Sequence, residues 1–207
     1  ALSDEFIKEK LDEYFHAHPQ EKKKLEENDY NKKSATYKKT MKDIRATLRD
    51  AYGLFQTTSL DKRRTLLQTY KQARGRGERI GLLDKLLASH QSTKERKNFF
   101  STYYKQIFSI TGKPTHIIDI GCGYNPLSYR WLGCEPYYEA SDIAQADIEM
   151  INDFFTYEDI EGEAYTLDLL HDEQRKEHLS NTKADMAFIL KLIDTLEGQR
   201  RDITKTI

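Results

Sequence analysis

The sequence predicts an α/β domain with a parallel sheet, preceded by an all-helical segment. Four short strand candidates, at about residues 115–120, 137–141, 164–168 and 185–190, alternate with segments of helical pattern. In the first 112 residues the apolar side chains recur at helical spacing instead. Strands that alternate with helices along a chain form a parallel sheet. We therefore expect the sheet in the C-terminal half.

The turn after the first expected strand is the most informative feature. Residues 118–126 read Ile-Asp-Ile-Gly-Cys-Gly-Tyr-Asn-Pro, in which Gly121 and Gly123 allow the backbone to approach a ligand closely. Pro126 stands where a new helix would take its first turn. Asn125 replaces the third glycine of the dinucleotide fingerprint, and no Gly-Lys-Ser/Thr follows. The pattern favours a cofactor without pyrophosphate, with a purely structural strand-to-helix turn as the alternative.

This Asp-x-Gly-x-Gly turn is similar to the S-adenosylmethionine loop of class I methyltransferases, and two later acidic residues support the same ligand. Asp142 follows the second expected strand about twenty residues after the glycines, where a carboxylate can accept both ribose hydroxyls. Asp168 follows the third strand and is placed to accept from the adenine amino group. Taken singly, either residue is also explained as a loop or helix-cap residue.

Basic and acidic residues are divided between the two halves of the chain. Lysine and arginine outnumber aspartate and glutamate by 24 to 15 in residues 1–112, whereas residues 113–207 have 9 against 19. The formal net charge of −1 hides this division. Such asymmetry is typical of a protein in which one part binds a polyanion; a pair of solvated helical surfaces is the alternative.

Helices with a basic face account for much of the N-terminal excess. An amphipathic helix is expected at residues 5–16 and a polar, lysine-rich connector from there to residue 33. A second apolar stripe runs through residues 37–55, and a third helix spans residues 58–74. The segment 74–79 contains two glycines and is interpreted as a hinge, or else as a solvated loop. The cations on these elements that could bind a polyanion are Lys38, Lys42, Arg45, Arg49, Arg63, Arg64, Arg74 and Arg76.

Length and composition limit the remaining possibilities. A chain of 207 residues suits one domain with an appendage or two small ones. No apolar run reaches the roughly eighteen residues of a membrane span, and the first ten residues lack the order of a signal peptide. The two cysteines, Cys122 and Cys134, suit neither a disulfide framework nor a zinc site, so no metal is expected. Cys122 is interpreted as a small residue of the turn rather than a nucleophile, and a cytoplasmic location is expected.

Three separated motifs together resemble one enzyme family. Residues 90–96 read His-Gln-Ser-Thr-Lys-Glu-Arg, and residues 119–127 read Asp-Ile-Gly-Cys-Gly-Tyr-Asn-Pro-Leu. Further on, Ala-Phe-Ile-Leu-Lys at 187–191 is followed by Leu-Glu-Gly-Gln-Arg at 196–200. In this order they resemble the aminoglycoside-resistance 16S ribosomal RNA methyltransferases that modify guanine 1405 at N7. The first 70 residues match that family only as a basic, helical extension.

The resemblance implies a fold, a cofactor and a target. It implies a class I, Rossmann-like domain that binds S-adenosylmethionine at residues 77–207, after a helical ribosome-docking domain at residues 1–76. It also implies a monomer that acts on 16S rRNA within the assembled 30S subunit, with neither DNA nor a membrane as partner. No general base is expected, because guanine N7 has a lone pair and no proton. The rate enhancement would come from in-line positioning of N7 and the methyl group and from desolvation of the donor.

Individual residues take roles by the same resemblance. Arg96, or else Lys94, would bind the methionine carboxylate, since guanidinium pairs with carboxylate through two parallel bonds. Lys191 and Glu197 lie beyond the fourth strand and would position the target, with an ordinary helix ion pair as the alternative. The expected cofactor residues are Arg96, Gly121, Cys122, Gly123, Asp142, Ile143, Asp168 and Leu169.

The chain departs from the family pattern in one respect. Only four strand candidates occur, so the catalytic domain is expected to be incomplete at its C-terminus, and the fourth strand would be an exposed edge. The activity of the 207-residue chain itself therefore stays open. Two other functions stay open as well: a class I methyltransferase that acts on another RNA or on a small molecule, and a non-catalytic RNA-binding fragment.

Overall fold

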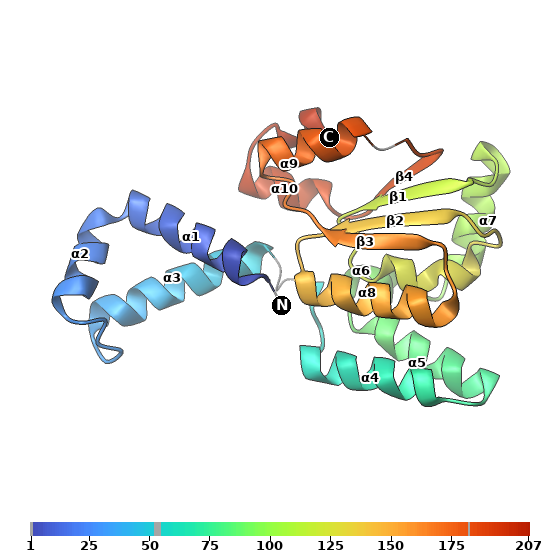
Figure 1. Ribbon diagram of the computed structural model, residues 1–207, viewed down its shortest axis with the longest axis horizontal. Coiled ribbons are helices and arrows are strands. Elements are labelled where there is room, and N and C mark those ends of the chain that lie inside the picture. Colours follow the sequence, from blue (N-terminus) through green and yellow to red (C-terminus); the bar gives the residue numbers. More distant parts are fainter. Residues whose placement is uncertain (1, 52–54, 182) are drawn as a thin grey trace. The chain divides into compact units, whose positions relative to one another are not determined.

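The computed structural model describes residues 2–51, 55–181 and 183–207 (Figure 1). The chain forms two compact units, Leu2–Leu54 and Phe55–Ile207, here called the N-terminal unit and the sheet unit. The expected boundary was residue 76. Residues 55–76 instead group with the sheet unit, because the helix that begins at Leu60 packs against two helices of that unit. Within the described residues, no helix is both long and apolar enough to cross a membrane.

The N-terminal unit contains three helices that share a small core. They are α1 (Asp4–Ala17), α2 (Pro19–Glu27) and α3 (Ala35–Ala51), and their buried side chains include Phe6, Leu25 and Ile44. The polar connector expected up to residue 33 is wrong over α2. Proline has no N–H to lose in the first turn of a helix, so Pro19 begins α2 as well as following α1.

A tyrosine joins the three helices of this unit. The Tyr14 hydroxyl on α1 donates to Glu21 Oε2 on α2 at 2.7 Å and lies 3.1 Å from Asp43 Oδ2 on α3. Burial and the two carboxylates raise the pKa of Tyr14 to about 12, so the hydroxyl keeps its proton. Lys39 pairs with Glu21 from the solvent side. These contacts connect all three helices of the N-terminal unit to one another.

The sheet unit contains four parallel strands in the order β3-β2-β1-β4, which confirms the expected α/β class. The strands lie close to the four predicted runs. Pro126 lies in the first turn of a helix as expected, but this helix is a 3-10 helix that begins at Asn125. The elements in chain order are α4 (Leu60–Gln72), α5 (Arg76–Ala88), α6 (Gln91–Arg96), α7 (Phe100–Thr111), β1 (His116–Ile120), η2 (Asn125–Trp131), β2 (Tyr137–Asp142), α8 (Gln145–Glu158), β3 (Gly162–Thr166), α9 (Asp172–Asn181), β4 (Met186–Ile189), α10 (Ile193–Gln199) and η3 (Ile203–Thr206).

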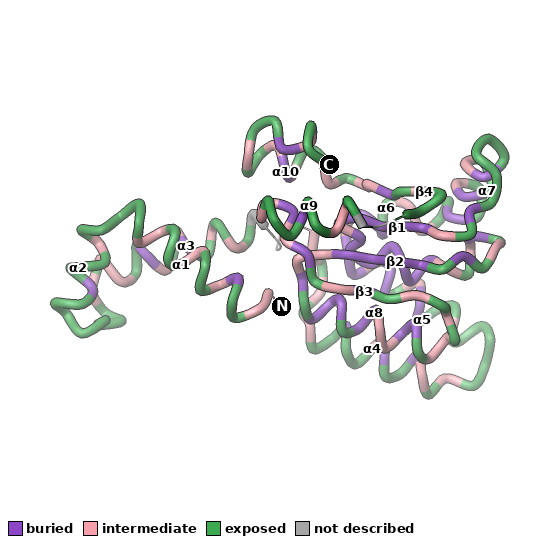
Figure 2. Tube along the Cα trace, turned by 45° about the horizontal axis from the view of Figure 1, so that its top comes forward, coloured by how far each residue is buried: buried purple, intermediate pink, exposed green. Residues whose placement is uncertain are grey.

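Helices cover both faces of the sheet. In Figure 1, α4, α5 and α8 lie on one side of the strands and α9 and α10 on the other. Side chains alternate along β1, so Ile117 belongs to the cluster under α5 and α8, whereas Ile118 and Ile120 belong to the cluster under α10. Burial is most continuous along β1 and β2 (Figure 2). These two strands form the centre of the unit.

A buried ion pair joins α4 to α8. Arg63 of α4 is 2% exposed and pairs with Asp147 in the first turn of α8. Tyr124 lies beside both: its hydroxyl accepts from Arg63 Nη1 at 2.8 Å and donates to Asp147 Oδ1 at 3.1 Å. The expectation that Arg63 is a surface cation for RNA is therefore wrong. A charge this deeply buried needs a partner of opposite sign, and Asp147 supplies it.

A second buried acid lies directly beneath the turn after β1. Asp119 is fully buried, and its Oδ2 accepts from Asn125 Nδ2 at 2.9 Å and from the Tyr138 hydroxyl at 2.7 Å. Within the described part of the chain its Oδ1 has no hydrogen-bond partner. Burial raises the pKa of Asp119 to about 6, although both donors oppose the shift. The Asp119 carboxyl group therefore titrates in a pH range in which the folded protein can be studied.

Removing one member of the Arg63–Asp147 pair should destabilise the sheet unit strongly. Arg63→Ala would leave Asp147 buried without its partner, and we expect a loss of about 3–5 kcal/mol in the free energy of unfolding, measured by urea denaturation. Arg64→Ala is the matched control, because Arg64 is the next residue of α4 and is exposed. It should change stability by less than about 0.5 kcal/mol. Equal effects of the two substitutions would contradict the structural role of the pair.

Asp119 should also give the protein a measurable pH dependence. The folded protein keeps the Asp119 proton to about pH 6 and the unfolded chain only to about pH 3.8, so the stability from this group is lost as pH rises between these values. Relative to Asp119→Asn, wild-type protein should lose about 2–3 kcal/mol from pH 4 to pH 6. Burial lowers the pKa of His90 to about 4, which gives the opposite slope, but that contribution cancels between the two proteins. A stability difference that does not vary with pH would refute the assignment.

Candidate functional site

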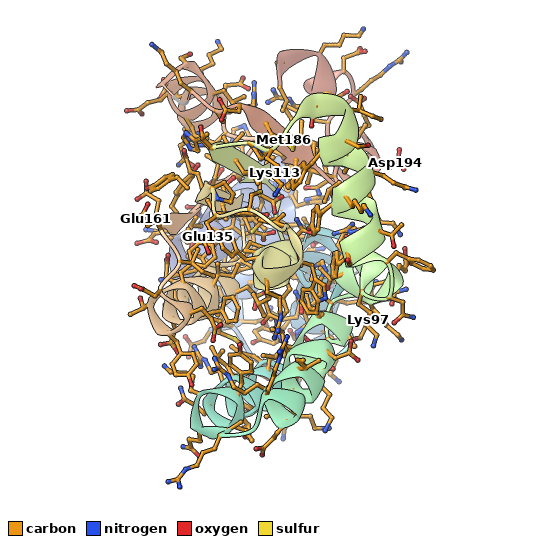
Figure 3. The ribbon with its side chains drawn as sticks, turned by 90° about the vertical axis from the view of Figure 1, so that its right-hand side faces the viewer. Lys97, Lys113, Glu135, Glu161, Met186 and Asp194 are labelled. Atoms are coloured by element: carbon orange, nitrogen blue, oxygen red, sulfur yellow. The ribbon has the colours of Figure 1, made fainter. Side chains whose placement is uncertain are left out.

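The expected cofactor residues gather where the parallel strands end. β1 runs into the glycine turn, β2 ends at Asp142, and Asp168 follows β3. The chain passes outward from β1 to β3 and then returns to β4 on the other side of β1. Ligands of open α/β sheets bind at this kind of switch point. Figure 3 faces the opposite end of the sheet, where Lys113, Glu135, Glu161 and Met186 precede or begin the four strands.

Both glycines of the turn are required by conformation, and a side chain lies close beside each of them. Gly121 has φ +63° and Gly123 has φ +51°, in the left-handed region that glycine adopts without strain. A Cβ atom on Gly121 would lie 2.7 Å from Leu192 Cδ1, and one on Gly123 would lie 2.6 Å from His90 Cε1. Between them, Cys122 is buried and its backbone N–H donates to Ser141 O at 2.9 Å. Burial raises the pKa of the Cys122 thiol, so the thiol keeps its proton and lines the turn as an uncharged side chain.

Asp142 connects the end of β2 to the glycine turn. Its Oδ2 accepts from the Gly123 N–H at 2.9 Å and its Oδ1 from the Ala144 N–H at 3.0 Å. Burial raises its pKa, while the bonds from Gly123 and Ala144 oppose that shift. Each carboxylate oxygen has two lone pairs and can accept more than one hydrogen bond. The group is therefore fixed in place and still has capacity for ligand hydroxyls, with half-buried Ile143 beside it.

Asp168 is held by a local turn rather than by a helix end. Its Oδ1 accepts from the Leu170 N–H at 2.8 Å, and α9 begins only at Asp172. The helix-cap alternative is thereby excluded. Leu169, the next residue, is buried in the cluster that includes Ile118 and Ile120. The structure thus places Asp168 and Leu169 at the same end of the sheet as Asp142.

Arg96 reaches the glycine turn from α6. Its Nη1 donates to Ser92 Oγ at 2.8 Å and its Nη2 to Asn125 Oδ1 at 3.2 Å. In the described part of the chain the buried Nε has no partner. Lys94, the other residue considered for the methionine carboxylate, is exposed. Of these two candidates the geometry favours Arg96, which is buried at its Nε and bonded to Asn125 of the turn.

Two residues at this site were not predicted. Asn125 joins Arg96 to Asp119 through its two side-chain atoms, so it is a structural connector of the turn. His90 is 8% exposed, with its ring stacked on Phe55 at 5.7 Å and its edge against Gly123. Burial and two nearby arginines lower the pKa of His90 to about 4, so the ring is neutral at pH 7. The feature of the sequence that could have identified these two residues is their position inside the motifs at 90–96 and 119–127.

Lys191 and Glu197, the expected target-positioning residues, do not contact each other in the described contacts. Lys191 follows β4 in the left-handed region at φ +59° and pairs with Glu95 of α6. Glu197 of α10 accepts from the backbone N–H of Asp202 at 2.8 Å and of Thr204 at 3.0 Å. The hydroxyl and N–H of Thr204 lower the pKa of Glu197. Its carboxylate therefore holds the turn that follows α10.

The other predicted cations lie on the surface. Arg64 is exposed and lies 3.5 Å from Glu149, while Arg74 and Arg76 are exposed where α5 begins. The hinge expected at residues 74–79 is wrong from Arg76 onward, because that part is the first turn of α5. Four exposed cations line a groove on one face of α3: Lys38, Lys42, Arg45 and Arg49.

Comparisons with known proteins agree with this geometry. A 16S rRNA (guanine(1405)-N(7))-methyltransferase of Micromonospora echinospora is 28% identical over 166 residues, which are 78% of this chain and 58% of that protein. The protein of the same name from Micromonospora rosea is 30% identical over the same shares. The chain thus spans less than two thirds of the length of these relatives.

Solved structures show the same fold, and the family model extends over nearly the whole chain. The 16S rRNA methylase RmtB matches with a TM-score of 0.69 at 25% identity, over 98% of this chain and 70% of that one. RmtF, solved with S-adenosyl-L-homocysteine, matches with a TM-score of 0.68 at 21% identity, over 99% and 76%. The model of the ribosomal RNA methyltransferase (FmrO) family matches residues 11–205. On that extent of match, the chain belongs to the ribosomal RNA methyltransferase (FmrO) family.

Proposed function

We propose that the protein containing this chain transfers the methyl group of S-adenosylmethionine to N7 of guanine 1405 in 16S rRNA, which confers aminoglycoside resistance. One observation carries the proposal: the glycine turn, Asp142 and Asp168 occupy the carboxyl ends of three adjacent parallel strands, in a chain of a ribosomal RNA methyltransferase family. Relatives named for this reaction support the choice of target. The protein would act as a cytoplasmic monomer on the assembled 30S subunit.

The residues at the site fit each part of the cofactor. Asp142 would accept the ribose hydroxyls, and Asp168 with Leu169 would bind the adenine, with Ile143 as an apolar wall. Arg96 would bind the methionine carboxylate, and its buried Nε without a partner in the described structure is the atom that supports this role. Gly121, Cys122 and Gly123 would bring the backbone close to the ligand. The carboxyl groups of Asp142 and Asp168, at the carboxyl ends of the strands, would also favour the binding of a positively charged sulfonium.

Methyl transfer at this site would need no proton transfer. S-adenosylmethionine, held by the residues named above, would supply an electrophilic methyl group, and the lone pair of guanine N7 would accept that group with no proton to remove. The protein would contribute in-line positioning and desolvation of the charged donor. Lys191 would contact the RNA, and Glu197 would act indirectly by holding the turn that follows α10.

The N-terminal unit would dock on ribosomal RNA through α3. Lys38, Lys42, Arg45 and Arg49 recur on one face of this helix, while Ile44 faces the core of the unit. Cations that neutralise phosphates release counterions, and this contribution does not depend on sequence. Arg64, Arg74 and Arg76 are exposed on the sheet unit and would supply further cations for RNA.

The direct test is the position and the chemical site of the modification. Natural-length protein incubated with S-adenosylmethionine and 30S subunits should make the 16S rRNA cleavable by borohydride and aniline at guanine 1405, with weaker modification of naked RNA. Asp142→Ala should weaken cofactor binding about 5- to 150-fold, the range for leaving buried hydrogen-bond partners unpaired. Asp61→Ala, which removes an exposed acid of α4, should not. Methyl incorporation at an adenine N1 would sink the proposed target.

Reversing the charges on α3 should separate docking from cofactor binding. Replacing all four exposed cations of the α3 groove with glutamate should lower the affinity of the protein for 30S subunits. It should also flatten the salt dependence of that affinity, because fewer counterions are released. The same four positions changed to glutamine should give an intermediate loss. Cofactor affinity, measured by calorimetry, should stay unchanged in both. If subunit affinity and its salt slope both keep their wild-type values, the α3 face is only a solvated surface. The positions are Lys38, Lys42, Arg45 and Arg49.

A further inference from the structure

We propose that Glu95 is a positioning residue for Lys191. The pair keeps residues 190–192 closed over the glycine turn until RNA draws Lys191 away. The inference rests on the proposed function, because it gives Lys191 an RNA phosphate as its second partner. It concerns the same edge of the sheet and adds a gate between cofactor and target.

The pair connects two elements that are distant in sequence. Glu95 is on α6, directly before Arg96, whereas Lys191 follows β4 and is 96 residues further along the chain. Gln91 Nε2 donates to Glu95 Oε1 at 2.8 Å, and Lys191 Nζ donates to Oε2. Gln91 lies one turn earlier on α6, so it orients the carboxylate toward Lys191. Both oxygens of Glu95 are therefore engaged.

The residue after Lys191 closes the turn. Leu192 fills the space beside Gly121, where a Cβ atom would meet its Cδ1 and Cδ2 at 2.7 and 2.8 Å. Leu192 also packs on the apolar cluster that includes Ile118 and Ile120. Lys191 and Leu192 are consecutive, so one side chain is held by α6 while the next covers the first glycine. A change of the backbone at Lys191 would therefore be passed directly to Leu192.

The backbone of Lys191 favours such movement. Its φ of +59° lies in the left-handed region, which is unfavourable for a residue with a Cβ atom. The contacts on either side, Lys191 with Glu95 and Leu192 with Gly121, hold this conformation. If the first contact is lost, the backbone can relax toward an ordinary conformation. The segment thus has a closed state and a reason to leave it.

RNA is the partner that suits the open state. The side chain of Lys191 is 47% exposed and that of Glu95 41%, and an ion pair this exposed is weak enough for a polyanion to displace. While paired, Lys191 is neutralised and is unavailable to a phosphate. Its release would uncover the edge between β1 and β4, at the switch point of the sheet. RNA binding and opening of the site would then be one event.

Glu95→Gln tests the gate in natural-length protein. The amide keeps the size of the side chain and an oxygen for Gln91, but it loses the charge that holds Lys191. Hydrogen exchange of the peptide at residues 188–196 should become faster while other peptides keep their rates. Affinity for 30S subunits should rise about two- to five-fold, the range for an exposed ion pair. Glu78→Gln, which changes an exposed acid of α5, is the matched control and should alter neither.

Exchanging the two charges supplies a rescue. Glu95→Lys combined with Lys191→Glu should restore slow exchange in the 188–196 peptide, yet bind 30S subunits more weakly than wild-type protein, as Lys191→Ala should. A merely structural Glu95 would not raise RNA affinity when changed. Unchanged exchange in Glu95→Gln, or equal or weaker subunit affinity, overturns the inference. If wild-type protein does not bind 30S subunits, the proposed function fails instead, and the exchange measurement still reports on the pair.

Discussion

The Arg63–Asp147 ion pair determines where the helices before the sheet can lie. Both side chains are almost fully buried, and the cost of desolvating two charges is large enough that such a pair adds little net stability. The pair instead specifies how α4 and α8 pack, because each of the two charges can be buried only next to the other. Asp147 is in the first turn of α8, where the helix dipole favours an acid. Near the surface, Lys71 of α4 also pairs with Asp153 of α8 at 2.6 Å, but the Arg63–Asp147 pair is the buried contact between the two helices.

The glycine turn depends on that arrangement. Tyr124 belongs to the turn and bonds to both members of the ion pair. The next residue, Asn125, is bonded to Asp119 beneath it and to Arg96 beside it. A turn built by the sheet alone would need only the end of β1 and Asp142. Here α4 and α6 also hold it, which explains why residues 55–76 belong to the sheet unit rather than to a separate docking domain.

Features set by local pattern were predictable, and features set by distant partners were not. The strands follow from short apolar runs, and Gly121 and Gly123 follow from their place after β1. Arg63 could not be distinguished from Arg64 in sequence, because the difference is Asp147, 84 residues away. The helix α2 was missed because Leu25 is its buried apolar residue and most of the others are polar. The roles of Asn125 and His90 likewise depend on what the fold brings beside them.

The two glycines have neighbours of different character, and this difference bears on how the site works. His90 lies against Gly123, neutral, buried and stacked on Phe55, so that side of the turn is a fixed wall. Leu192 lies against Gly121 from a segment whose preceding residue is exposed and in an unfavourable backbone conformation. The fixed side adjoins Asp142, the proposed ribose ligand, and the weakly held side adjoins Lys191, the proposed RNA contact. On the proposed function, a rigid cofactor site with a displaceable cover on the target side would let the cofactor bind before the RNA completes the site.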